Sequence, residues 1–142
     1  MLLQVFLFRT KILLVSKCGK RTMKILLIDD NQDITTMFAK YFQLKGHDIH
    51  VSNGGQNGLQ MIENGLFDVI LLDLAMPDFS GHDIIDYLHK NNKLDHKIII
   101  SLTASSVSDD DKAYLIERGV HSVLRKPIDP DELLNYLMRV KS

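Results

Sequence analysis

Three aspartates and one lysine stand where they could form a single chemical site. Asp29 and Asp30 follow one apolar run, and Asp73 ends a second. Lys126 follows another. A charge buried near the edge of a sheet costs several kcal/mol unless it is paired or bound to a metal. Clustered carboxylates also repel one another, and a hard divalent cation such as Mg²⁺ relieves that repulsion through oxygen ligands.

The same residue types suit phosphoryl transfer. A carboxylate can act as a nucleophile toward phosphorus and form an aspartyl phosphate. Such a transfer depends on positioning and on neutralisation of charge. Lys126 and a metal ion would supply positive charge, and the hydroxyl of Thr103, which ends a further apolar run, would supply a hydrogen bond. The set of residues around Asp73 matches these requirements.

Alternating strand and helix patterns must bring these residues together. Strands are expected near residues 25–28, 47–51, 67–72, 98–102 and 120–124, and each is followed by apolar residues at helical spacing. This βα repeat predicts an α/β fold, a doubly wound five-stranded parallel sheet with helices on both faces. The second strand alternates in polarity, which favours an edge position. Ligands bind such sheets beyond the carboxyl ends of the strands, where all five polar residues are expected.

The first helix carries the clearest helical pattern. A cap at Asp30 or Asn31 is expected to begin it, and Gly46 to stop it. Apolar residues at helical spacing predict one buried face, made of Ile34, Met37, Phe38, Tyr41 and Leu44.

Composition limits the class of protein. The chain has 142 residues, 45% apolar and 25% charged, as expected of one globular domain. Cys18 is the only cysteine, so an internal disulfide is excluded and a reducing compartment is favoured. Residues 23–142 hold 12 basic and 18 acidic residues, which argues against nucleic acid as a direct ligand.

Residues 1–22 differ from the rest and are expected to form an extension ahead of a domain over 23–142. They contain five basic residues and no acid, and no apolar stretch in them is long enough for a membrane span. Their charges lie within and behind the apolar part, unlike those of a secretory signal. The extension is interpreted as an upstream mis-start before Met23 or a disordered tail. Alternatives are a short partner-binding or membrane-touching segment, or an extra packed element.

Four short motifs, taken together and in order, resemble the receiver domain of two-component response regulators over residues 23–140. The resemblance is to the stand-alone, chemotaxis-regulator-like type, with a flavodoxin-like strand order of 2-1-3-4-5. The motifs are Ile28-Asp29-Asp30-Asn31, Asp73-Leu74-Ala75-Met76-Pro77, Leu102-Thr103-Ala104 and Arg125-Lys126-Pro127.

The resemblance implies a set of metal ligands. Asp30 and Asp73 would bind Mg²⁺ directly, together with the backbone carbonyl of Ala75. Asp29 would act mainly through a bound water.

The resemblance also implies the phosphoryl chemistry. Asp73 would accept a phosphoryl group from a phosphohistidine on a sensor histidine kinase or a histidine phosphotransfer protein. Thr103 would turn toward that group, and Lys126 would pair with Asp73 or with its phosphate. The Lys126–Pro127 peptide bond is expected to be cis.

Some positions depart from the family pattern or vary within it. Receivers commonly carry Tyr or Phe three residues before the lysine, where this chain has Val123. Phosphorylation could then be retained while the signal to the last helices is altered, unless Tyr114 substitutes for the missing ring. Ala75 and Ser105 occupy positions that tune dephosphorylation in the family, and their small size suggests open access for water.

We therefore interpret the chain as a cytoplasmic, phosphorylation-dependent signalling switch that is an enzyme only toward its own phosphorylation and hydrolysis. With the chain ending at Ser142, the expected output is contact with a downstream protein or onward phosphotransfer. Two alternatives remain. One is a degenerate receiver that binds proteins without being phosphorylated. The other is a Mg²⁺-dependent phosphohydrolase, although Ala75 stands where such enzymes usually carry a general acid.

Overall fold

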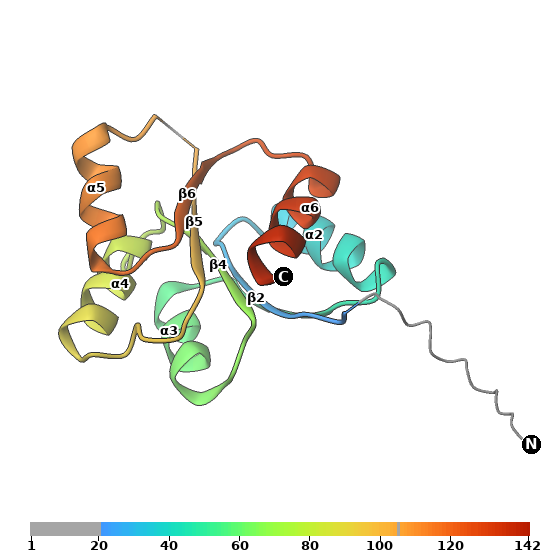
Figure 1. Ribbon diagram of the computed structural model, residues 1–142, viewed down its shortest axis with the longest axis horizontal. Helices are drawn as coiled ribbons and strands as arrows, with labels where there is room; N and C mark the ends of the chain where they lie inside the picture. Colours follow the sequence, from blue (N-terminus) through green and yellow to red (C-terminus); the bar gives the residue numbers. More distant parts are fainter. Residues whose placement is uncertain (1–20, 105) are drawn as a thin grey trace, which may run out of the picture.

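A computed structural model of the chain describes residues 21–104 and 106–142. The predicted extension therefore lies outside the described residues except for its last two, and so does Ser105. The described part contains five strands and five helices that alternate along the chain (Figure 1). In order they are β2 (Lys24–Ile28), α2 (Gln32–Leu44), β3 (Asp48–Ser52), α3 (Gly55–Asn64), β4 (Val69–Asp73), α4 (Gly81–Lys90), β5 (Ile99–Thr103), α5 (Asp109–Arg118), β6 (Ser122–Arg125) and α6 (Pro130–Lys141).

The sheet has the predicted topology. Its strands lie in the order β3-β2-β4-β5-β6, and every pairing is parallel. Since β2 is the first of these strands along the chain, this is the order 2-1-3-4-5. The alternating strand β3 lies at one edge, as expected. Strands β2 and β4, which are apolar except for Lys24 and Asp73 at their ends, lie inside the sheet.

Helices cover both faces of the sheet. In Figure 1, α2 and α6 lie together on one side, and α3, α4 and α5 lie on the other. Successive strand residues point to opposite faces, so Leu26 and Ile28 pack toward α3 and α4, while Ile25 and Leu27 pack toward α2 and α6. Beyond the two cores, Asp29, Asp73, Thr103 and Lys126 lie at or directly after the carboxyl ends of the strands. None of the described helices is long and apolar enough to cross a membrane.

The buried face of α2 differs in part from the predicted one. Phe38 is buried as expected, but Thr35 and Phe42 are its buried neighbours. Met37 is 44% exposed and Leu44 is 87% exposed, so the prediction was wrong for these two residues. The helix packs along the line from Phe38 to Phe42, which places Met37 off the buried stripe and Leu44 at the free end of the last turn.

The caps and turns agree closely with the sequence. Asn31 caps α2, with its side chain accepting two backbone N–H groups. Ser108 and Asp129 cap α5 and α6 in the same way. The Lys126–Pro127 bond is cis, as expected. Helix α4 begins at Gly81, and the side chain of Ser80 caps it by accepting the N–H of Asp83.

Candidate functional site

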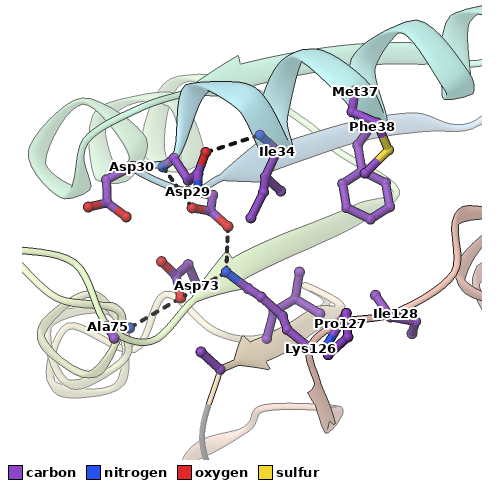
Figure 2. Close-up of a pocket in the computed structure, with 13 residues that line it drawn as sticks. Asp29, Asp30, Ile34, Met37, Phe38, Asp73, Ala75, Lys126, Pro127 and Ile128 are labelled. Atoms are coloured by element: carbon purple, nitrogen blue, oxygen red, sulfur yellow. Dashed lines mark hydrogen bonds and ion pairs between the residues drawn. The ribbon is translucent and has the colours of Figure 1, made fainter.

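The carboxyl ends of four strands place the predicted site residues side by side. Asp29 and Asp30 follow β2, Asp73 is the last residue of β4, and Thr103 is the last residue of β5. Lys126 follows β6, and its backbone N–H donates to the carbonyl of Thr103 over 2.7 Å. Figure 2 shows the side chains of Asp29, Asp30, Asp73 and Lys126 converging on one cleft. Thr103 lines a separate, smaller cavity.

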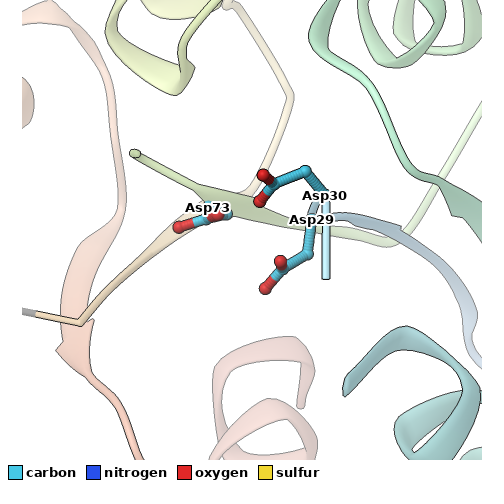
Figure 3. Close-up of side chains that lie close together, drawn as sticks. All are labelled: Asp29, Asp30 and Asp73. Carbon is cyan, nitrogen blue, oxygen red and sulfur yellow. The ribbon is translucent and has the colours of Figure 1, made fainter. Parts of the chain in front are cut away.

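The three aspartates form a compact acidic cluster (Figure 3). Each offers a carboxylate oxygen, and these atoms lie within 4.8 Å of one another. Asp29 is 1% exposed and Asp73 is 3% exposed, whereas Asp30 is open to solvent. Hard cations take oxygen ligands of this kind, and Mg²⁺ typically uses one or two carboxylates and keeps several waters. The donor set therefore fits Mg²⁺, with Asp30 on the side from which a hydrated ion would arrive.

Asp73 has a carboxyl group that is costly to ionise. Burial, followed by the nearby charge of Asp29, raises its pKa above the usual value, and Lys126 only partly offsets this. One carboxylate oxygen, Oδ1, accepts the N–H of Ala75 over 3.3 Å. A bound cation would relieve the remaining repulsion between the carboxylates of Asp73 and Asp29, and a covalent modification of Asp73 would alter it.

Lys126 is held mainly by Asp29. Its ammonium lies 2.7 Å from Asp29 Oδ2 and 3.4 Å from Asp73 Oδ1. Burial lowers the pKa of Lys126, but the hydrogen bond to Asp29 and the two carboxylate charges outweigh that effect and raise it. The family resemblance implied a pair with Asp73, so the structure adds Asp29 as the nearer partner of the lysine.

Both oxygens of Asp29 are engaged within the protein. Oδ2 accepts the ammonium of Lys126, and Oδ1 accepts the backbone N–H of Asn31 over 2.9 Å. Asp29 therefore acts as an anchor that holds the lysine beside Asp73. Asp30 is the exposed carboxylate of the cluster, and Asp73 is buried like Asp29.

Val123 stands where receivers commonly carry Tyr or Phe, as noted from the sequence. Val123 and Thr103 line a small cavity of about 170 Å³ beneath the loop after β5. Tyr114, the possible substitute, directs its hydroxyl at Asp86 of α4 over 2.6 Å, and Arg118 stacks on its ring. In this structure Tyr114 serves a contact between α4 and α5.

A cleft of about 440 Å³ opens beside the acidic cluster. One wall is polar and carries the aspartates and Lys126. The other is apolar and is formed by α2 and by the segment after β6 (Figure 2), with Ile34, Met37, Phe38, Pro127 and Ile128.

Two residues that support the site were not identified from the sequence. A Cβ on Gly81 would lie 2.4 Å from the carbonyl oxygen of Asp73, so only glycine lets α4 begin this close to the end of β4. Asn53, in the loop after β3, donates from its side chain to the carbonyl of Asp29 over 2.9 Å. Neither contact leaves a local pattern: Asn53 and Asp29 are 24 residues apart, and the approach at Gly81 depends on the path of the loop after β4.

Comparisons with known proteins agree with this geometry. Residues 25–138 match the family model described as "Response regulator receiver domain". The response regulator SaeR of Staphylococcus aureus is 32% identical over 121 residues, which cover 82% of this chain and 51% of that protein. The chain thus spans about half the length of the curated relatives it matches.

Solved structures show the same fold. The chemotaxis response regulator CheY4 of Vibrio cholerae is 28% identical, with a TM-score of 0.74 over 84% of this chain and 99% of that one. A structure described as the BeF3-activated DrrB receiver domain is 25% identical, with a TM-score of 0.68 over 84% and 97% of the two chains.

The fold and the site define a doubly wound α/β domain with an acidic cluster and a lysine at the carboxyl edge of its sheet. The matches place this arrangement in a known family. The chain belongs to the response regulator receiver domain family, whose members are signalling proteins of two-component systems.

Proposed function

We propose that the chain is a phosphorylation-dependent switch that accepts a phosphoryl group on Asp73 in the cytoplasm. The observation that carries the proposal is the buried carboxylate of Asp73, crowded by Asp29 and facing the ammonium of Lys126 in an open cleft. The likeness to DrrB, described as activated by BeF3, lends support, since BeF3 is an analogue of a phosphoryl group.

The donor would be a phosphohistidine on a sensor histidine kinase or a histidine phosphotransfer protein. A carboxylate oxygen of Asp73 gives its electron pair to phosphorus, and a new O–P bond forms. The N–P bond breaks, and its electron pair returns to the imidazole nitrogen, which then takes up a proton from solvent. Hydrolysis of the acyl phosphate by water would return Asp73 to its starting state.

Mg²⁺ would be held by Asp30 and Asp73, together with the backbone carbonyl of Ala75, and by Asp29 mainly through water. The close carboxylate oxygens and the raised pKa of Asp73 support this assignment, because both indicate uncompensated negative charge. When bound, the ion would supply charge neutralisation for phosphoryl transfer.

Lys126 and Thr103 would stabilise the phosphoryl group once it is attached. The ammonium of Lys126 already lies 3.4 Å from Asp73 Oδ1 and would bind a phosphoryl oxygen through a short displacement. Thr103, at the end of the neighbouring strand, would donate its hydroxyl to another oxygen. Both contacts gain strength from the charge on the phosphoryl group.

The apolar wall of the cleft suits the protein that delivers the phosphoryl group. Met37 is 44% exposed on this wall, beside Ile34 and Ile128, and the wall adjoins the carboxylate that must be reached. An amphipathic helix bearing the phosphohistidine could bury its apolar residues there and bring the imidazole to Asp73. The output would be a contact with a downstream protein or onward phosphotransfer, with no direct binding of nucleic acid and no catalysis beyond the chain's own phosphorylation and hydrolysis.

Incubation with acetyl phosphate and Mg²⁺, followed by intact mass measurement, tests the proposal. The wild-type chain should gain one phosphoryl group, and Asp73→Asn should gain none. Asp78→Asn, in the loop after β4, is the matched control and should be modified like the wild type. Absence of modification on the wild type, or equal modification of Asp73→Asn, would overturn the proposal.

A further inference from the structure

We infer that Asn53 is a positioning residue of the acidic cluster, whose side-chain amide holds the Asp29–Asp30 peptide and thereby sets the affinity of the site for Mg²⁺. The inference rests on the proposed function. It concerns a residue in the loop after β3 whose amide binds a backbone carbonyl and a hydroxyl, not a carboxylate of the site.

The regular ladder between β2 and β3 ends just before the acidic cluster. The last paired residues are Ile28 and Ser52. One bond follows, in which the N–H of Asp29 donates to the carbonyl of Ser52 over 3.0 Å. In a regular parallel ladder the carbonyl of Asp29 would next accept the N–H of Gly54. The N–H of Gly54 instead lies 3.4 Å from the hydroxyl oxygen of Ser52.

The side chain of Asn53 replaces that missing bond. Its amide nitrogen lies 2.9 Å from the carbonyl oxygen of Asp29. Both peptides that flank the Cα of Asp29 are thus held by β3 and its loop, one by Ser52 and one by Asn53. The second of these peptides leads directly into Asp30, the exposed carboxylate of the cluster.

The chain has a physical reason to leave the ladder at this point. A Cβ on Gly55 would lie 1.9 Å from the carbonyl oxygen of Phe79, so the start of α3 is pressed against the loop that follows β4. Gly54 and Gly55 turn the backbone away from β2 to make this contact. A side chain long enough to reach back is then needed at Asn53.

The orientation of the Asn53 amide is determined by its partners. The carbonyl of Asp29 can only accept, so it must face the amide nitrogen of Asn53. The same nitrogen lies 3.0 Å from the hydroxyl oxygen of Thr35, a residue that is 2% exposed on the inner face of α2. The hydroxyl of Thr35 in turn donates to the carbonyl of Gln32 over 3.2 Å. Both hydrogens of the amide therefore have acceptors, and the side chain has one favoured direction.

Loss of this amide would release the Asp29–Asp30 peptide without removing a carboxylate. Residues that hydrogen-bond to metal ligands and orient them typically change metal affinity by 10–100-fold when they are removed. Because Asn53 acts on the backbone of the ligands, we expect Asn53→Ala to weaken Mg²⁺ binding by roughly tenfold, at the lower end of that range.

The experiment is a Mg²⁺ titration of the full chain, followed through the backbone amide signals of Asp73 and Ala75 in NMR spectra. The variants are Asn53→Ala and Thr35→Val, with Asn64→Ala as the matched control, an exposed asparagine at the far end of α3. The second readout is phosphorylation by acetyl phosphate as a function of Mg²⁺ concentration. The half-saturating Mg²⁺ concentration should rise in Asn53→Ala, while the rate at saturating Mg²⁺ stays near the wild-type rate.

A purely structural role for Asn53 would lower stability in the absence of Mg²⁺ and leave the half-saturating concentration unchanged. That result would overturn the inference. Thr35→Val removes the second acceptor and keeps the buried volume, so it should shift Mg²⁺ affinity in the same direction by a smaller factor. If Asn53→Ala does not fold, unchanged Mg²⁺ affinity in Thr35→Val overturns the inference, and weaker affinity supports it.

The wild-type titration separates this inference from the proposed function. If the wild-type chain neither binds Mg²⁺ nor gains a phosphoryl group, the proposed function is overturned and the role of Asn53 with it. If the wild type does both and Asn53→Ala matches it at every Mg²⁺ concentration, only the role of Asn53 is overturned.

Discussion

The ammonium of Lys126 lies 2.7 Å from Asp29 Oδ2 in the unphosphorylated chain. This ion pair joins the end of β2 to the segment after β6, across the two strands that lie between them in the sheet. It holds the lysine, already paired, beside Asp73, the proposed phosphorylation site. Phosphorylation of Asp73 would then redistribute an existing contact, since the ammonium already faces both carboxylates.

Replacement of Lys126 by Met is expected to destabilise the metal-free protein. Asp29 would remain buried with an uncompensated charge, and the free energy of unfolding should fall by about 2 kcal/mol, somewhat less than for a fully buried pair. The pKa of Lys126 is raised in the folded state, so its contribution is present at neutral pH and is lost as the pH rises above the usual lysine value of 10.5. Urea unfolding at pH 7 measures the effect.

The matched control for this variant is Lys141→Met. Lys141 lies 3.4 Å from Asp68, and both side chains are about 30% exposed. An exposed pair contributes about 1 kcal/mol or less. Equal losses for the two variants would show that Lys126 does not compensate a buried charge.

Asp73→Asn should stabilise the metal-free protein at neutral pH. The pKa of Asp73 is raised by burial and by Asp29, so the folded state keeps a proton at pH values where the unfolded chain has lost it. Stability therefore falls as the pH rises through the window between the usual value of 3.8 and the raised one. Asparagine removes this cost.

The measurement is urea unfolding of both proteins in chelator from pH 3 to pH 7. The stability difference should be largest near pH 7 and should shrink toward the lower end of that window. A variant less stable than the wild type at pH 7 would contradict the expected sign.

Mg²⁺ should raise the melting temperature of the wild-type chain through Asp30 and Asp73. A ligand that binds only the folded state stabilises it by about 2.7 kcal/mol at a concentration one hundred times its Kd. Asp30→Asn should remove most of this gain, because it neutralises the exposed ligand of the cluster. Thermal unfolding with and without Mg²⁺ provides the comparison.

Asp78→Asn controls for the general effect of removing an acid near the cleft. Asp78 has a positive φ of 67°, a conformation that Asn also tolerates, so the loop should keep its shape. This variant should respond to Mg²⁺ like the wild type. A response that survives in Asp30→Asn would exclude Asp30 as a ligand.

Gly81→Ala should displace the backbone of Asp73, the proposed phosphorylation site. The added Cβ would meet the carbonyl oxygen of Asp73 at 2.4 Å and the Cα of Leu74 at 2.8 Å, both of them backbone atoms. Overpacking of this kind costs about 1–3 kcal/mol. We expect lower stability by urea unfolding and slower modification of Asp73 by acetyl phosphate.

Gly54→Ala is the control for a general effect of replacing glycine. A Cβ at Gly54 would have nothing within 4 Å, and its φ of −154° is open to any residue. Gly54 is the N-cap of α3, where alanine is less favoured than glycine, so this variant should cost no more than about 1 kcal/mol. Wild-type behaviour of Gly81→Ala would mean that α4 shifts away from Asp73 without consequence.

Most of the fold follows from the sequence because its strands are short, mainly apolar runs with clear breaks, apart from the alternating edge strand β3. Buried parallel strands such as β2 and β4 need such runs, and caps such as Ser108 mark the helices between them. The strand ends then bring Asp29, Asp73 and Lys126 together through topology alone.

The remaining features depend on contacts between distant segments. Apolar spacing identified α2 but misplaced Met37 and Leu44, because the partner surface decides which of several overlapping stripes is buried. The hydrogen bond of the Asn53 amide and the close approach of Gly81 to Asp73 result from tertiary packing. No periodic pattern in the sequence predicts them. The preference of Lys126 for Asp29 over Asp73 is a difference of less than 1 Å in position, which motif spacing does not resolve.

The acidic cluster also fixes a balance of charge. Three carboxylates and one ammonium leave two negative charges without a counter-ion, which one divalent cation would cancel and a monovalent cation would not. Phosphorylation would replace the single charge of Asp73 by up to about two. The phosphorylated form should therefore hold Mg²⁺ more tightly, and by linkage Mg²⁺ should favour the phosphorylated form by the same factor.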